Sequence, residues 1–368
     1  MLGRGVLVSD VPWRRDAAQL GERIGAWAAR VIGAHVTVDE VTAPEGTGMS
    51  SETVLFSLTG GPSGAADRYV ARLAPDPSVV PVFPVYDFEL QQRCMDLVRA
   101  ETTVPTPTAP WYEPDPSWLG TPFLVMGRIA GVAPPDIPPY VLGGWLFDTS
   151  GAERSIIEAN ATDVLVRLHA LNPQDHDLAF LDRPEHGTTA IDQHLGYQRW
   201  YYDWARQGVV YPLIERAFDW LEDNRPLERP AVLNWGDARI GNILWRGTEV
   251  SAVLDWEMAA LGPAEVDVAW MIWLHRFFQS LAESYGAPGL PGFLDRARVI
   301  ALYERASGRG LDDLRWYEVF AATRHAIITV RTMGRTIAFG TRAAPADPDD
   351  LINFRDLLEQ MLEGRYWQ

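Results

Sequence analysis

The hydrophobic period of this sequence changes along the chain, and that change constrains the fold more than any other feature. Residues 13–32 place apolar side chains at intervals of three and four, which is the pattern of an amphipathic helix. Three short β-branched, apolar-rich stretches come next at 35–41, 53–58 and 69–73, and glycine-rich turns separate them. The first part of the chain is therefore predicted to form one helix and an antiparallel meander.

Helical patterns dominate the rest of the chain. A helix is expected at 86–100, and after a Pro-rich passage an apolar run at 123–126 ends at Gly127. Further helices are predicted at 152–171, 190–206, 211–223, from about 264 onward, and at 348–364. Three short strand-like pieces, 231–235, 242–245 and 250–254, interrupt this helical half. We expect an α+β fold with a small antiparallel-sheet lobe at 1–127, a hinge near Met126 and Gly127, and a larger, mainly helical lobe at 128–368.

Charge and composition exclude several classes of function. The net charge is −17, and all 32 basic residues are arginine because the sequence contains no lysine. A Walker loop ending in Gly-Lys-Ser/Thr and a Schiff-base lysine are therefore impossible. The acidic balance argues against nucleic-acid binding, and no apolar run has the length of a signal peptide core or membrane span, so a cytoplasmic protein is expected. The single Cys94 lies in a helical pattern and is predicted to be a buried free thiol.

Three polar residues interrupt the apolar strand-like pieces of the helical half. Asp237 and Asn242 are five residues apart, and Asp255 comes directly after a second apolar run. An unpaired carboxylate at a buried strand end is costly, and a divalent cation held by an Asn carbonyl and an Asp carboxylate removes that cost. Phosphoryl transfer also needs a carboxylate that orients the attacking hydroxyl and accepts its proton, and Asp237 is placed for that role.

These residues carry a resemblance to a known family. The run from Asp237 through Arg239 to Asn242, with Asp255 and an aromatic residue after it, resembles the catalytic and metal-binding loops of the aminoglycoside phosphotransferase family of the kinase-like superfamily. The branch it resembles most contains the kinase-like domains of acyl-CoA dehydrogenase family proteins. The resemblance implies a protein-kinase-like fold, ATP or GTP as phosphoryl donor, and Mg²⁺.

The same resemblance implies roles for individual residues. Asp237 would be the catalytic base or orienter, and Arg239 would neutralise phosphate charge. Asn242 and Asp255 would bind magnesium, with Glu257 as a further ligand, directly or through water. Asp267 matches the carboxylate that holds the catalytic loop from the start of the next helix. Trp235 stands where the family has His before Gly-Asp.

The first lobe would supply the nucleotide site. A loop of small residues before the second strand resembles the family's nucleotide loop, with Gly46, Gly48, Ser50 and Ser51 as its candidates. Arg72 stands where the family usually has Lys, and Glu89 stands where the partner of that Lys is expected. Arg presents a wide fork rather than a point charge, so this exchange bears on how α- and β-phosphates are held. Met126 would lie at the hinge, where the backbone selects ATP or GTP.

Each of these interpretations has a structural alternative. Arg72 and Glu89 could form a surface salt bridge, the Gly46–Ser51 loop could be an ordinary hairpin turn, and Glu257 could be a solvated charge. Trp residues of the second lobe, Trp270 among them, could pack the core or line an acceptor pocket. His169 is interpreted as a packing or surface residue.

The sequence thus favours a magnesium-dependent phosphotransferase that moves the γ-phosphoryl group of ATP or GTP to a hydroxyl of a small acceptor. The acceptor class stays open: a cationic molecule suits the net charge, and hydroxyacyl thioesters, macrolides, amino alcohols and sugars are all candidates. A catalytically silent kinase-like binding protein is the alternative, and Arg72 is its main support. A metal-dependent hydrolase is disfavoured because His-rich ligand sets are lacking. No pattern indicates an oligomeric state.

Overall fold

The structure is a computed structural model, and it describes residues 15, 17–42, 50–61, 67–76, 79–311 and 313–368. The chain divides into two compact units. The first comprises residues 1–96 and 107–129, and the second comprises residues 97–106 and 130–368.

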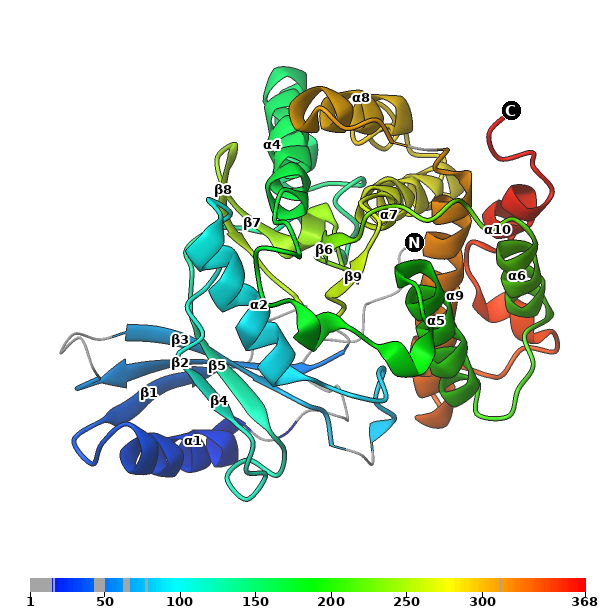
Figure 1. Cartoon of the computed structure of the whole chain (residues 1–368). Helices are drawn as coiled ribbons and strands as arrows, with labels where there is room; N and C mark the ends of the chain where they lie inside the picture. The colour runs from blue at the N-terminus through cyan, green and yellow to red at the C-terminus, as the bar shows by residue number, and fades with distance from the viewer. Residues whose placement is uncertain (1–14, 16, 43–49, 62–66, 77–78, 312) are drawn as a thin grey trace. The chain divides into compact units, whose positions relative to one another are not determined.

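The first unit is built on an antiparallel sheet of five strands (Figure 1). The strands are β1 (Thr37–Thr42), β2 (Glu52–Thr59), β3 (Asp67–Leu73), β4 (Trp111–Glu113) and β5 (Phe123–Gly127), in the order β1-β2-β3-β5-β4. The predicted meander is confirmed in β1, β2 and β3, and β5 matches the apolar run at 123–126. Strand β4 was not predicted because three residues between prolines are too few to show a strand period.

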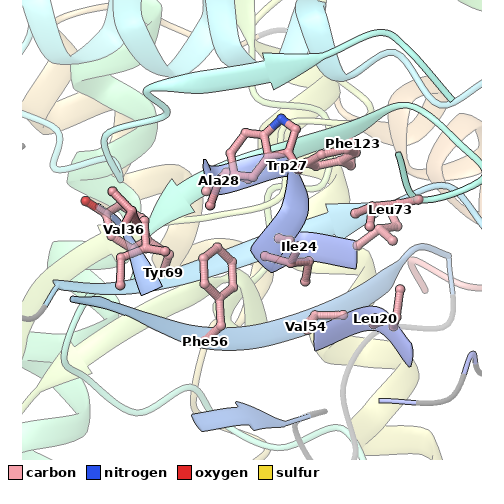
Figure 2. Packing of buried hydrophobic residues seen from close by; sticks show 14 residues of the cluster. Leu20, Ile24, Trp27, Ala28, Val36, Val54, Phe56, Tyr69, Leu73 and Phe123 are labelled. Atoms are coloured by element: carbon pink, nitrogen blue, oxygen red, sulfur yellow. The ribbon is translucent and has the colours of Figure 1, made fainter. Parts of the chain in front are cut away.

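Helix α1 (Ala17–Val31) supplies one side of the first unit's core. Its buried face carries Leu20, Ile24 and Trp27, which point toward the sheet residues shown in Figure 2. The Trp27 indole meets Phe123 edge-on at a centroid distance of 5.2 Å and donates to Glu113 Oε2 at 3.1 Å. Burying each large apolar side chain contributes about 1.5–3 kcal/mol, so this face fixes the helix against the sheet. Helix α2 (Phe88–Glu101) comes after β3 and carries Cys94, which is a buried free thiol as expected.

The second unit is mainly helical. Its helices are α3 (Trp145–Asp148), α4 (Gly151–His169), α5 (Ala190–Ala205), α6 (Pro212–Asp223), α7 (Glu265–Ser284), α8 (Arg296–Ser307), α9 (Arg315–Ala338) and α10 (Arg355–Leu362). Capping boxes begin α4 at Ser150 and α5 at Thr189, and both starts lie within one residue of the predicted ones. Helix α9 packs against α5, α6 and α7. No helix in the described part of the chain is long and apolar enough to span a membrane.

The single helix expected at 348–364 is wrong. The structure has a 3₁₀ turn at Pro348–Leu351, an extended Ile352, and then α10. Leu351, Ile352 and Phe354 are all buried. One continuous helix would spread these neighbouring side chains around its circumference, so the chain bends to bury them together.

Two short β ribbons lie within the helical unit. Strand β6 (Val232–Asn234) pairs with β9 (Ala260–Gly262), and β7 (Ile243–Arg246) pairs with β8 (Glu249–Val253). Three of these strands match the predicted strand-like pieces, and β9 was missed because it has only three residues. The candidate catalytic residues lie on the connections β6–β7 and β8–β9.

Candidate active site

The loop after β6 is held by a buried carboxylate at the start of α7. Asp267 is fully buried, and it accepts hydrogen bonds from the backbone N–H groups of Trp235 at 2.6 Å and Gly236 at 2.9 Å. His169 Nε2 lies 3.2 Å from its Oδ2. The predicted role of Asp267 in holding the loop is confirmed. His169 is buried, which agrees with its interpretation as a packing residue, and it is also hydrogen-bonded to both Asp267 and Tyr303, so it supports the loop.

Trp235 and Gly236 shape the backbone just before Asp237. Gly236 has a φ of +91°, and a Cβ there would lie 2.0 Å from the carbonyl oxygen of Met258, so no other residue fits. Trp235 is fully buried, and its Nε1 donates to the carbonyl of Leu254 at 2.8 Å. This bond ties the loop after β6 to the residue that precedes Asp255.

Both carboxylate oxygens of Asp237 are hydrogen-bonded. Oδ1 accepts from Trp270 Nε1 at 2.7 Å. Oδ2 accepts from Asn242 Nδ2 at 2.6 Å and from Arg239 Nε at 3.1 Å. The three donors come from α7 and from the loop itself, so the carboxylate plane is set from two directions.

These contacts keep Asp237 ionised. Burial by itself raises the pKa of this carboxyl, but the charges of Arg239 and Arg324 and the hydrogen bonds from Trp270 and Asn242 together outweigh it, so the pKa lies below its ordinary value. Burial lowers the pKa of the Arg239 guanidinium, but the negative charges of Asp237 and Asp136 raise this pKa above its ordinary value. The loop therefore presents a fixed negative carboxylate beside a fixed guanidinium.

Asp136 is a site residue that the sequence did not reveal. Arg239 Nη1 donates to its Oδ1 at 2.8 Å and to its Oδ2 at 2.9 Å, across 103 residues of sequence. Asp136 lies in the Pro-rich passage that opens the second unit, and a lone acidic residue between prolines carries no local signal of a partner.

Asn242 and Asp255 are brought together by backbone hydrogen bonds. The N–H of Leu254 donates to the carbonyl of Asn242 at 2.9 Å, which places Asp255 one residue away from this contact. Because Asn242 Nδ2 donates to Asp237, its Oδ1 is the amide atom left to act as a metal ligand. Asp255 has a φ of 62°, a conformation uncommon outside glycine and often found at functional sites.

The side-chain oxygen atoms of these residues are of the type that binds a hard divalent cation. Mg²⁺ prefers oxygen ligands and is commonly bound through one or two protein carboxylates together with substrate phosphates. Asn242 and Asp255 offer an amide and a carboxylate oxygen, and the partly exposed Glu257 lies two residues further on. Over the described ranges, no three His, Cys, Asp or Glu side chains gather closely enough to form a metal cage. Magnesium binding by Asn242, Asp255 and Glu257 stays a prediction.

The sequence relationship agrees with this geometry. Residues 43–317, well over half of the chain, match the model of the phosphotransferase enzyme family. The chain belongs to that family. Acyl-CoA dehydrogenase family member 10 of Mus musculus is 27% identical over 263 residues, which covers 70% of this chain and 22% of that protein. The chain thus spans less than a quarter of the length of this relative.

Solved structures share the fold of this phosphotransferase family member. A Ralstonia eutropha protein assigned as an aminoglycoside phosphotransferase superposes with a TM-score of 0.63 at 23% identity, covering 94% of this chain and 98% of that one. The aminoglycoside phosphotransferase APH(4)-Ia, in a ternary complex with AMP-PNP and hygromycin B, gives a TM-score of 0.54 at 16% identity, with 92% and 98% covered. The expected α+β, protein-kinase-like fold with two lobes is confirmed.

The nucleotide candidates of the phosphotransferase lie in its first unit. Gly46 and Gly48 fall outside the described residues. The nearly buried Arg72 donates from Nε at 3.0 Å and from Nη2 at 2.7 Å to Ser51 Oγ. The structure therefore brings Arg72 to the end of the predicted nucleotide loop.

The remaining nucleotide-site candidates of the first unit are Ser50, Glu89 and Met126. The carbonyl of Ser50 accepts from the Tyr86 hydroxyl at 2.9 Å. Glu89 is exposed in the first turn of α2, and Met126 pairs with Val70 across β5 and β3. The pairing of Arg72 with Glu89 stays a prediction.

Arg324 on α9 is a second residue that the sequence did not reveal. It is buried, its Nη2 donates to the carbonyl of Gly236, and its guanidinium carbon lies 3.9 Å from the centre of the Trp270 ring. Trp270, interpreted from sequence as core or pocket wall, is buried, and it also contacts both Arg324 and Asp237. A polar residue within a long helical pattern gives no signal of such a contact 88 residues away.

Proposed function

We propose that this protein is a magnesium-dependent phosphotransferase that moves the γ-phosphoryl group of ATP or GTP to a hydroxyl of a small molecule. The observation that carries the proposal is the Asp237 carboxylate, kept ionised and hydrogen-bonded on both oxygens, on a loop whose backbone is tied to Asn242 and to the residue before Asp255. Membership of the phosphotransferase enzyme family supports the same reaction class.

In this proposal Asp237 aligns the acceptor hydroxyl and takes its proton as transfer proceeds. Each carboxylate oxygen has two lone-pair directions, so an oxygen that already accepts from Trp270 can still accept from a substrate hydroxyl. Arg239, held by Asp136 and Asp237, neutralises charge on the transferring group. Most of the rate acceleration then comes from positioning and from fixed charges.

Magnesium would be held by Asn242 and Asp255, with Glu257 as an additional ligand, and when bound it would supply positive charge against the β- and γ-phosphate oxygens. The nucleotide would be held by the lobe at 1–127, through the loop with Gly46, Gly48, Ser50 and Ser51, through Arg72 with Glu89, and through the backbone at Met126. The lobe at 128–368 would carry the acceptor.

Replacing Arg72 tests the nucleotide half of this proposal. We expect Arg72→Met to weaken MgATP binding about tenfold or more, because a charge-assisted contact to phosphate is lost, and Arg72→Lys to weaken it less, because the charge is kept while the fork is lost. Calorimetric titration with MgATP measures both. Arg68→Met, at an exposed arginine on the same strand, is the control. Wild-type affinity in Arg72→Met would reduce Arg72 to a structural partner of Ser51.

Two acceptor classes are suggested by the relatives. The net charge of −17 and the hygromycin B bound to APH(4)-Ia support a cationic hydroxylated acceptor. The likeness to an acyl-CoA dehydrogenase family member supports a hydroxyacyl thioester. A screen of both panels with MgATP and MgGTP, read as acceptor-dependent release of nucleoside diphosphate, tests the proposal. Phosphorylated product from either panel supports it and names the class.

A catalytically silent nucleotide- or ligand-binding protein is the second candidate, and Arg72 in place of the family's usual lysine favours it. Nucleotide binding without any transfer, to either acceptor panel or to water, would support this candidate over the enzyme.

A further inference from the structure

Trp270 occupies a position that the proposed chemistry has not used. It lies in the first turns of α7, three residues after Asp267, and it is 3% exposed. Its Nε1 donates to Asp237 Oδ1 at 2.7 Å from outside the loop. The other two donors to Asp237, Arg239 and Asn242, belong to the same loop as Asp237 and move with it. Trp270 therefore links the carboxylate to a long helix.

The indole of Trp270 is itself held in place. The guanidinium of Arg324 lies over its ring at 3.9 Å, and the same side chain donates to the carbonyl of Gly236. A cation over the face of an indole is attracted by the ring and draws electron density from it, which strengthens the N–H as a donor. Arg324 Nη2 also donates to Met258 Sδ at 3.8 Å, while its Nε has no hydrogen-bond partner among the described residues.

We propose that Trp270 is a positioning residue of the phosphotransferase, that it fixes the Asp237 carboxylate through its indole N–H, and that Arg324 clamps the indole through its ring face. The catalytic part of this inference rests on the proposed function. The structural part rests on the contacts of Trp270 with Asp237 and Arg324 and on the hydrogen bond from Arg324 to Gly236. In this proposal the hydrogen bond from Trp270 fixes Asp237 Oδ1 from the side of α7. The second lone pair of Oδ1 then stays directed at the acceptor hydroxyl. A displacement of the order of 1 Å at such a point can cost about a hundredfold in rate.

A neighbouring tryptophan provides a matched control. Trp273 lies on the same helix, is fully buried, and donates from Nε1 to His325 Nδ1 at 3.2 Å rather than to Asp237. Trp270→Phe and Trp273→Phe each remove one buried indole N–H from α7 and keep an aromatic ring. A purely structural role for Trp270 would affect both variants in the same way.

The first measurement does not depend on turnover. In an indole ¹⁵N–¹H spectrum of the full chain, the Trp270 signal is the one missing from Trp270→Phe, and we expect it to move upfield in Asp237→Ala while the Trp273 signal moves less. Asp237→Asn, which keeps the side-chain volume, is a second variant should Asp237→Ala fold poorly. A Trp270 signal that stays in place in both variants overturns the proposal.

The second measurement is the rate of ADP release from MgATP, with water as the acceptor. We expect Trp270→Phe to lower kcat about tenfold to a hundredfold with KM for MgATP within about threefold, and Trp273→Phe to leave both within about threefold. Equal kcat values in wild type and Trp270→Phe overturn the positioning role. A wild-type chain that releases no ADP yet shows the indole shift counts against the proposed function while supporting the contact between Trp270 and Asp237.

Discussion

Asp237→Asn is expected to lower phosphoryl transfer by about 10³-fold or more while leaving nucleotide affinity within about threefold. A positioned general base contributes about 10²–10⁴ in rate, and the neutral amide loses both the charge and the proton-accepting oxygen. The amide NH₂ would also face a donor on whichever side it turns, since Trp270 donates to one oxygen and Arg239 and Asn242 donate to the other. The measurement is steady-state kcat with the acceptor found in the screen, together with calorimetric titration of MgATP.

The matched control for this variant is Asp203→Asn, at an exposed aspartate on α5 whose carboxylate pairs with Arg206. It changes net charge equally and should keep wild-type kcat. If Asp237→Asn were folded, bound MgATP and turned over within tenfold of the wild type, Asp237 would not be the catalytic carboxylate.

Asp267→Ala is expected to destabilise the protein by about 3–5 kcal/mol. The substitution leaves the N–H groups of Trp235 and Gly236 without their buried acceptor, and each unsatisfied group costs about 1–3 kcal/mol. It also removes the partner of His169 Nε2. Urea denaturation measured by circular dichroism gives the change in free energy of unfolding.

Asp267→Asn tests how much each of the two backbone hydrogen bonds to Asp267 contributes to stability. The amide keeps one acceptor oxygen, so we expect a loss of about half that of Asp267→Ala. A stability in Asp267→Ala within about 1 kcal/mol of the wild type would mean that the loop finds other acceptors, and that Asp267 does not hold it.

Local signals account for the elements that the sequence predicted correctly. Helical patterns of apolar residues predicted the starts of α4 and α5 within one residue, and Ser150 and Thr189 form capping boxes at these starts. The strand-like pieces around Asp237 were visible as apolar runs broken by polar residues, and Asp267 was identified by its spacing in the family pattern. Strands β4 and β9, with three residues each, are too short for a period and are defined by their pairing partners.

Long-range contacts account for the site residues that the sequence did not reveal. Asp136 and Arg324 contact the loop that carries Asp237 from 103 and 88 residues away in the sequence, and each stands in a local sequence that fits an ordinary loop or helix. Trp270 was interpreted as a core residue or a pocket wall, because helical spacing of aromatic residues usually indicates a core. Its indole does lie in the core, but the polar end of the ring contacts Asp237, and that is decided by tertiary structure alone.

The most direct test of the central claim is a thermal-shift titration of the wild type and of Asp255→Ala with ATP and GTP, with and without magnesium. A ligand at a hundred times its dissociation constant stabilises the folded state by about 2.7 kcal/mol, which is a readily measured rise in Tm. We expect magnesium-dependent stabilisation of the wild type by at least one nucleotide, and its loss in Asp255→Ala. A wild type that neither nucleotide stabilises in the presence of magnesium would contradict the proposed phosphotransferase.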